Sequence, residues 1–192
     1  MRRLILLFAL LTCLPAARAL DLAGVTVADS VKTHAYGTEL KLNGAGIRQR
    51  FFMDIYIGAL YLPQPTRDAA AVLNLHGAKR MSLHFVHKEV DAEKLVAAWT
   101  EGFEKNLPPE QFRALRPRIA NFNGLFPTLR KGDRIDIDIL PRADKGATTQ
   151  VWLNGTLRGK VGGGDFARAL LQIWLGEHPV DADLKQALLG TD

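Results

Sequence analysis

The sequence predicts an α+β protein, in which a large antiparallel β-sheet is packed on one face by a layer of helices. Two observations lead to this prediction. Most segments with alternating apolar residues are joined by short turns, as in hairpins, and the clearest turn is the Asn154-Gly155 pair. The helical segments occur in runs rather than in strict alternation with strands. A ligand cavity can lie between such a sheet and its helices.

The first 19 residues have the composition of a secretory signal peptide. Met1-Arg2-Arg3 is basic, Leu4–Leu14 is apolar, and Ala17 and Ala19 are small residues at the positions that a signal peptidase reads. The apolar block is about half of the ~20 residues needed to span a bilayer, so we expect no integral membrane segment once the signal is removed. We therefore expect a signal peptide over 1–19, a single domain over 20–192, and a periplasmic or secreted protein.

Charge and cysteine content exclude several classes of function. Loss of Arg2, Arg3 and Arg18 with the signal leaves 22 basic and 20 acidic residues, which gives a formal net charge of +2. This balance gives no support for nucleic-acid binding. The only cysteine, Cys13, also leaves, and with it any disulfide or thiolate metal site. The histidines follow no metal-binding motif, so we expect neither a metal nor an organic cofactor.

Hydrophobic periodicity and turn residues define the expected elements of the first half of the chain. They are two short strands within 22–33, a strand over 38–42, a hairpin turn at Asn43-Gly44 followed by Gly46, a long buried strand within 51–62, a helix over 69–75 capped by Asp68, and a strand over 79–86.

The second half is expected to hold three further strands and four helices. They are helices over 92–107 and 110–126, a strand over 134–140, a hairpin of 148–153 with 157–161, a helix capped by Asp165 that runs to about 175, and a helix that starts after Asp181 and ends near 190. In the strand over 134–140 the isoleucines alternate with Asp136 and Asp138. This pattern predicts that both carboxylates lie on a solvent-exposed face.

Arg48, at the entrance of the long apolar strand, is the strongest functional lead. An arginine cannot lose its charge, so beside an apolar wall it must find an anion, a carbonyl or water. It could bind an anionic ligand, or it could simply pair with an acid such as Asp54 or Asp165. Tyr56 and Tyr61 are five residues apart on a strand and so face opposite sides, which allows only one of them to line a given cavity.

Four blocks of the chain together resemble the chalcone isomerase-like family, in particular its bacterial exported branch. The blocks are LNGAGIRQRFFMDIYIGALYLP at 42–63, KRMSLHFVHKEV at 79–90, the asparagine–glycine hairpin, and DFARALLQIWLGEHPVDADLKQALLG at 165–190. The resemblance implies the family's open-faced β-sandwich, with a cleft between sheet and helices. It also implies one of three roles, because the family includes enzymes that close a chalcone to a flavanone, fatty-acid-binding members, and members without known catalysis.

By this resemblance, the chain retains only one of the polar catalytic residues of the family's chalcone-closing enzymes. It is the arginine that follows a Gly-Ala-Gly sequence, which matches Arg48. The enzyme's two hydroxyl positions fall on Ile55 and Ile173, and its helix tyrosine and asparagine fall near Asp91 and Ala98. Fatty-acid-binding relatives hold the carboxylate with the arginine and a tyrosine. In this chain Tyr56 or Tyr61 could supply that hydroxyl from the strand.

We therefore expect a non-catalytic protein that binds a small amphipathic anion, such as a fatty acid, in the cleft between sheet and helices. The expected ligand-binding residues are Arg48, Tyr56, Ile55, Ile57 and Ile173. One alternative is an intramolecular lyase or isomerase of the chalcone isomerase type, which needs a second polar group facing Arg48. The other is an envelope protein-interaction module, which needs a collapsed cleft and an exposed apolar patch.

Overall fold

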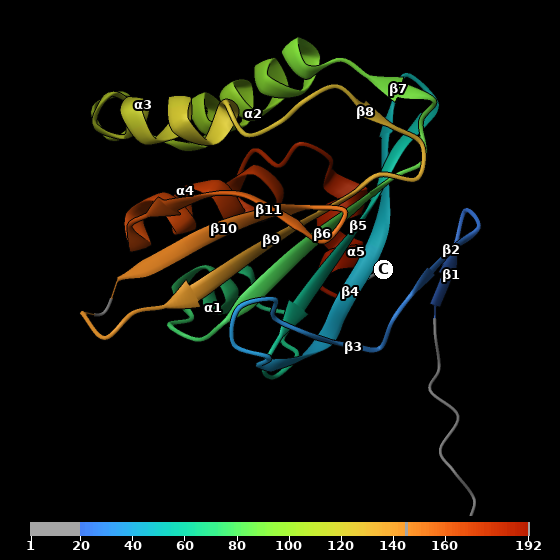
Figure 1. Cartoon of the computed structure of the whole chain (residues 1–192), viewed down its shortest axis with the longest axis horizontal. Coiled ribbons are helices and arrows are strands. Elements are labelled where there is room, and N and C mark those ends of the chain that lie inside the picture. The colour runs from blue at the N-terminus through green and yellow to red at the C-terminus, as the bar shows by residue number, and fades with distance from the viewer. Residues whose placement is uncertain (1–19, 145, 192) are drawn as a thin grey trace, which may run out of the picture.

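The structure, a computed structural model, describes residues 20–144 and 146–191. The expected signal peptide at 1–19 lies outside the described residues. A seven-stranded antiparallel sheet forms the centre of the molecule, and helices pack on one of its faces (Figure 1). The predicted fold class is therefore confirmed. The strand order is β11-β10-β9-β6-β5-β4-β3, so the edge strands are β11 and β3.

The strands agree with the periodicity of the sequence, with small additions. The main sheet contains β3 (Ser30–Lys32), β4 (Glu39–Arg50), β5 (Met53–Leu62), β6 (Lys79–Phe85), β9 (Arg134–Pro141), β10 (Ala147–Leu153) and β11 (Thr156–Gly162). Two further pairs are β1 (Leu20–Leu22) with β2 (Val25–Val27), and β7 (Glu89–Val90) with β8 (Leu129–Arg130). Asn154 and Gly155, both with positive φ, form the turn between β10 and β11 as expected.

Five helices complete the described part of the chain. They are α1 (Ala69–Asn74), α2 (Ala92–Asn106), α3 (Pro109–Asn123), α4 (Gly164–Leu175) and α5 (Ala182–Leu188). Asp68 caps α1 through its side chain, as expected, and Asp181 caps α5 in the same way. Asp165 does not cap α4, because the helix begins one residue earlier; its carboxylate accepts two hydrogen bonds from Arg118 instead. No described helix is long and apolar enough to cross a membrane.

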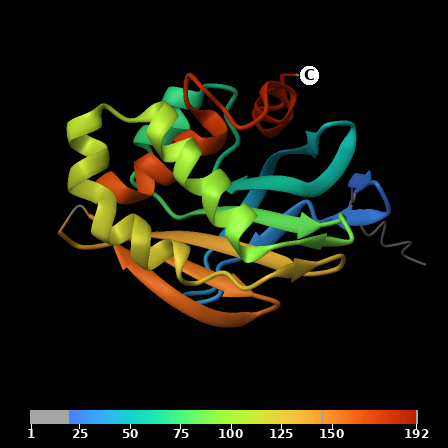
Figure 2. The same cartoon turned by 90° about the horizontal axis from the view of Figure 1, so that it is seen from above.

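The helix α4 is the core of the helical layer. It is buried on almost every side because it lies between the sheet and α2 (Figure 2). The buried stripe of α2, which includes Trp99 and Phe103, packs against it. The two helices cross where Gly102 of α2 meets Ile173 of α4, since a Cβ atom at Gly102 would lie 2.9 Å from the Ile173 side chain.

The hairpin between β4 and β5 turns at Phe51-Phe52, not at Asn43-Gly44 as the sequence predicted. Arg50 pairs with Met53, so the loop has two residues, and their φ values of 48° and 63° are those of a type I′ turn. Asparagine and glycine favour this turn, whereas a bulky side chain at positive φ is strained. Phe51 and Phe52 are nevertheless 77% and 102% exposed.

Asn43 marks a β-bulge within β4 rather than a turn. The register passes from Leu42 to Gly44, which leaves Asn43 as the extra residue. Its amide donates to the Leu188 carbonyl of α5, at 2.7 Å. The two glycines that follow, Gly44 and Gly46, let α5 approach the strand, because a Cβ atom at either one would collide with Ala187.

The face of the sheet opposite α4 is covered, which corrects the expected exposure of Asp136 and Asp138. Both residues are buried, at 1% and 0% exposure. The guanidinium of Arg80 donates two hydrogen bonds to Asp138, and the Ser82 hydroxyl donates to Asp136. Burial by itself would raise the pKa of Asp136, but the Ser82 hydrogen bond and the Arg80 charge lower it below its ordinary value.

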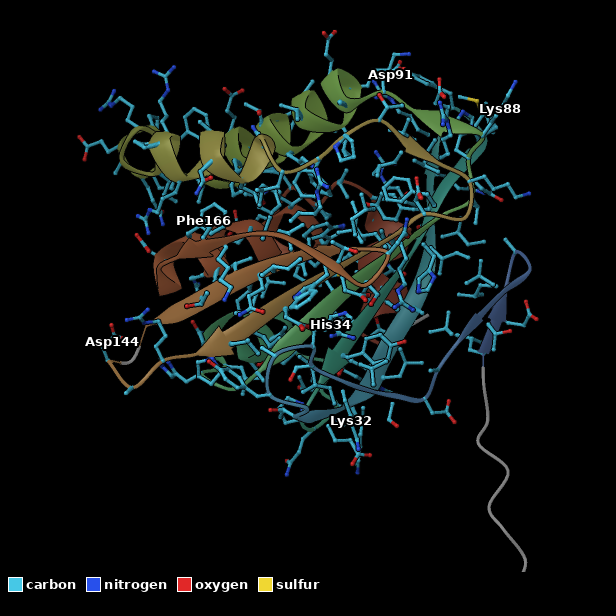
Figure 3. All side chains as sticks on the ribbon, viewed as in Figure 1. Lys32, His34, Lys88, Asp91, Asp144 and Phe166 are labelled. Carbon is cyan, nitrogen blue, oxygen red and sulfur yellow. The ribbon has the colours of Figure 1, made fainter. Side chains whose placement is uncertain are left out.

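His34, in the segment between β3 and β4, lies over the centre of this face (Figure 3). Its Nε2 atom is 2.9 Å from Asp136, its backbone N–H donates to Asp138, and its ring stacks on Trp152. Alternation in the sequence shows which residues share a face of a strand, but it does not show that a distant segment covers that face.

Candidate functional site: a cavity between the sheet and helix α2

A cavity of about 400 Å³ lies between the Phe51-Phe52 end of the sheet and α2. Ligand pockets in proteins typically have volumes of ~300–1,000 Å³. The cavity runs from exposed residues at the surface, such as Arg50 and Lys94, to the buried ring of Trp99. The strands β4 and β5, the short strand β7 and helix α2 each contribute part of its wall.

Arg48 lines this cavity from β4. Its side chain is 16% exposed, and its Nη1 atom donates to the neighbouring Gln49 carbonyl. The same atom lies 3.6 Å from a carboxylate oxygen of Asp181, the N-cap residue of α5. That carboxylate also accepts from the backbone N–H groups of Gln49 and Leu184. Asp181 is thus shared among several donors, and its distance from Arg48 is that of a loose ion pair.

The acids considered from the sequence are engaged elsewhere. Asp54 accepts from the Gln49 side chain, and Asp165 pairs with Arg118. Neither satisfies Arg48, so Asp181 is its acidic partner in the described structure. Because this one contact is long, the Arg48 guanidinium retains donor capacity for an anion in the cavity.

Tyr56 lies directly opposite Arg48 in the antiparallel register of β4 and β5. Its hydroxyl accepts a hydrogen bond from the indole N–H of Trp174, at 3.0 Å. Burial raises the pKa of Tyr56 to about 12, although the Trp174 hydrogen bond and the Arg48 charge act in the opposite direction. The phenol therefore keeps its proton at physiological pH, and the hydroxyl can donate it to a ligand.

Trp99 contributes to the cavity wall from α2. Its ring lines the cavity and lies 5.4 Å from the Trp174 ring. Its indole N–H is buried and has no hydrogen-bond partner among the residues that the structure describes. A buried donor without a partner is energetically unfavourable unless a ligand or water satisfies it.

Ile55 also lines the cavity, although alternation places it on the other face from Tyr56. A second bulge explains this, because Tyr56 pairs with Arg48 and Asp54 with Gln49, which leaves Ile55 as the extra residue. The Ile55 carbonyl accepts from the backbone N–H groups of both Val86 and His87. The apolar part of the wall includes Ile55, Met53, Val90, Leu95, Ala98 and Val180.

Two of the expected ligand-binding residues are not in the cavity. Ile57 is buried on the opposite face of the sheet, in the cluster that also contains Tyr61. The expectation fails because the bulge at Ile55 breaks the two-residue period. Ile173 is buried on α4, where it fills the space above Gly102. As expected, only one of the two tyrosines lines the cavity, and that residue is Tyr56.

The structure also shows where the other positions inferred from the family lie. Ala98 lines the cavity, whereas Asp91 pairs with Lys94 at the start of α2. His87 and Glu89 line the cavity as well, and no motif in the sequence identifies them as residues of this site. A larger hollow of about 670 Å³ lies between α1 and the start of α4, but Arg48 and Tyr56 are not part of it.

Comparisons with known proteins bear on this geometry. The sequence model of the family described as chalcone isomerase-like matches residues 19–190. The chain belongs to the chalcone isomerase-like family. Among solved structures, the fold is similar to that of AtFAP1, a fatty-acid binding protein of Arabidopsis thaliana, with a TM-score of 0.64 and 16% sequence identity. The match covers 83% of this chain and 95% of AtFAP1. A comparison with curated proteins finds no match.

Membership of the family agrees with the four sequence blocks that suggested it. At 16% identity, the likeness to AtFAP1 shows a shared fold. Within that fold, this chain's own residues place two donors, Arg48 and Tyr56, in the wall of a cavity whose remaining lining is largely apolar.

Proposed function

We propose that this chalcone isomerase-like protein is an exported, non-catalytic binder of a long-chain fatty acid or a similar amphipathic carboxylate. The carboxylate accepts hydrogen bonds from Arg48 and Tyr56, and the hydrocarbon chain lies along the apolar wall formed by residues such as Ile55 and Leu95. Export to the periplasm or the medium is part of this proposal and rests on the signal-like sequence of residues 1–19.

The observation that carries the proposal is the pairing of Arg48 with Tyr56 across β4 and β5 inside the cavity. A guanidinium and a neutral phenol both donate hydrogen bonds, and a carboxylate only accepts them. Charge-assisted hydrogen bonds of this kind are about twice as strong as neutral ones. The fatty-acid binding protein AtFAP1, with which the chain shares its fold, gives independent support for a lipid-like ligand.

Calorimetric titration of a long-chain fatty acid into the mature protein tests the proposal. We expect Arg48→Ala to weaken binding about tenfold or more, because a hydrogen bond to a charged group contributes roughly 1.5–3 kcal/mol. The methyl ester of the same acid has no negative charge, so its affinity should be low and almost unaffected by Arg48→Ala.

Arg116→Ala is the matched control, because Arg116 is an exposed arginine of α3 outside the cavity lining. This variant should bind the fatty acid as the wild type does. Equal fatty-acid affinity in the wild type and Arg48→Ala, or no measurable binding by the wild type, would show that Arg48 is not the carboxylate ligand.

An intramolecular lyase or isomerase activity is the second candidate function. It is favoured by one observation, that the Arg48 and Tyr56 donors could equally hold an oxyanion while His87 or Glu89 in the same cavity moved a proton. Catalytic conversion of a chalcone by the wild type, lost in Arg48→Ala, would favour this function over simple binding.

A further inference from the structure

The Phe51-Phe52 turn lies at the mouth of the cavity and exposes its side chains. Phe51 lines the cavity, and Phe51, Phe52 and the adjacent Met53 are 77%, 102% and 45% exposed. Three consecutive exposed apolar side chains at the tip of a hairpin form a projecting apolar surface. Neither burial nor turn preference explains two phenylalanines at positive φ in this position. Strained residues of this kind occur most often where a protein binds something.

Unpaired positive charges surround this tip. Arg50 precedes it, and its guanidinium carbon lies 5.4 Å from the centre of the Phe51 ring. Lys88 and Lys131 are exposed and adjacent, because the Lys131 N–H donates to the Lys88 carbonyl. None of the three cations is paired with a carboxylate within the part of the chain that the structure describes.

Two of the acidic residues nearby are paired with other cations, whereas Asp54 and Asp133 accept hydrogen bonds from the neutral side chains of Gln49 and Asn154. Glu89 pairs with Arg130 at 3.1 Å, and Asp91 pairs with Lys94 at 2.7 Å. Lys88 and Asp91 lie at the same end of the molecule, above the ends of β4 and β5 (Figure 3). The strand β7 joins this end to the cavity wall, since Glu89 and Val90 also line the cavity. The tip, the unpaired cations and the cavity mouth thus lie together at one end of the molecule.

We propose that this surface docks on a membrane of anionic phospholipids. The aromatic rings insert at the level of the headgroups, while Arg50, Lys88 and Lys131 contact the lipid phosphates. This orientation brings the cavity mouth to the bilayer surface, so an amphipathic ligand can pass between membrane and cavity without crossing open water. The purpose of docking rests on the proposed function, whereas the docking itself does not.

Cosedimentation with phospholipid vesicles tests the docking, with vesicles of phosphatidylcholine alone and vesicles that also contain phosphatidylglycerol. The wild type should bind the anionic vesicles more tightly than the neutral ones. Phe52→Gly should weaken binding about tenfold, because it removes a fully exposed aromatic side chain. Glycine suits the second position of a type I′ turn, so a loss of binding by this variant cannot be attributed to unfolding.

Leu157→Ser is the matched control, because Leu157 is 39% exposed on the edge strand β11. It should bind vesicles as the wild type does. Lys88→Glu should selectively reduce binding to the anionic vesicles, by about fivefold or more. Wild-type protein that binds neither kind of vesicle, or Phe52→Gly protein that binds like the wild type, would overturn the proposal. A dimer that Phe52→Gly dissociates would also overturn it, because a second copy would then be the occupant.

Two further measurements separate this proposal from the proposed function. Phe52 does not line the cavity, so Phe52→Gly should bind fatty acid in vesicle-free solution with wild-type affinity. Arg48→Ala should lose the fatty acid and keep vesicle binding. Vesicle binding without fatty-acid binding would leave membrane docking in place and refute the proposed ligand.

Discussion

At the scale of single residues, the site depends on Arg48 and Tyr56 being cross-strand neighbours. Arg48 is held by the Gln49 carbonyl and loosely by Asp181, and Tyr56 is fixed by the Trp174 indole. Both side chains are therefore positioned before a ligand arrives, which lowers the entropy lost on binding. The sequence predicts Arg48 because a charged residue at the start of an apolar strand is unusual. It does not predict Asp181, which is distant in the chain.

The raised pKa of Tyr56 leads to a prediction about stability at high pH. The folded value is about 12 and the ordinary value is 10.0, so the unfolded chain releases the proton first. The contribution of Tyr56 is therefore fully present below pH 10 and is lost as the pH rises from 10 to 12. Two pKa units correspond to roughly 2–3 kcal/mol.

Urea denaturation of the wild type and Tyr56→Phe at a series of pH values measures this effect. At neutral pH the variant should be about 1 kcal/mol less stable, because the Trp174 N–H loses its acceptor. Phenylalanine has no proton to lose, so this difference should shrink and then reverse between pH 10 and 12. A difference that stays constant over this range would contradict the buried, neutral state of Tyr56.

At the scale of elements, the contact between α5 and β4 positions the site. The helix carries Asp181 at its N-terminus, and it lies close to the strand because Gly44 and Gly46 have no side chains. In the sequence, the glycines of the Gly-Ala-Gly segment predict a turn. Its actual role, to admit a helix more than a hundred residues further along the chain, requires the tertiary structure.

A double-mutant cycle tests this contact. The Cβ atom of Gly46→Ala would lie 2.5 Å from the Ala187 Cβ atom, so the substitution should destabilise the protein by about 1–3 kcal/mol. Because the collision is with a side chain, Ala187→Gly should recover about 1–2 kcal/mol in the double variant, measured by urea denaturation.

Gly44→Ala is the internal control for this cycle, because its Cβ atom would collide with the backbone carbonyl of Ala187. Ala187→Gly leaves that carbonyl in place and should not rescue Gly44→Ala. Strictly additive effects of Gly46→Ala and Ala187→Gly would show that the helix does not rest on Gly46.

The hairpin turns show what local sequence can and cannot predict. Asn154-Gly155 forms the expected type I′ turn, and Asn43-Gly44 lies in a bulge, although the two dipeptides are identical. The long hairpin instead turns at Phe51-Phe52, where local preference opposes the conformation. Local preference is overridden there because nine residues of β4 pair with β5, and this long register fixes where the chain reverses.

At the scale of the whole molecule, the sequence predicts the architecture and only part of the site. Alternating and helical periodicities locate the strands and helices, and the family blocks predict a cleft between the sheet and the helices. Ile57 is not in the cavity because the bulge at Ile55 inverts the face on which the following residues of β5 lie. Ile173 is not in the cavity because it packs against Gly102 where α2 and α4 cross. Asp136 and Asp138 were expected in solvent because the covering residue, His34, comes from a remote segment.

The sheet therefore separates two environments. One face carries a closed network of paired charges around Asp136, and the other carries a cavity in which Arg48 faces mostly apolar side chains. In the closed network the carboxylates belong to the protein, so it has no need of an external anion. Among the residues that the structure describes, Asp181 is the carboxylate paired with the Arg48 guanidinium, and the 3.6 Å contact is long enough to leave donors for a ligand carboxylate.

The most direct test of this account is the ionisation of a bound fatty acid labelled with carbon-13 at its carboxyl group. Nuclear magnetic resonance of the complex over a pH series reports the pKa of that group alone. If Arg48 and Tyr56 hold the carboxylate, its pKa lies well below that of the same acid free in solution and rises in Arg48→Ala. A bound acid whose pKa equals or exceeds that of the free acid, and is unchanged in Arg48→Ala, would contradict the account.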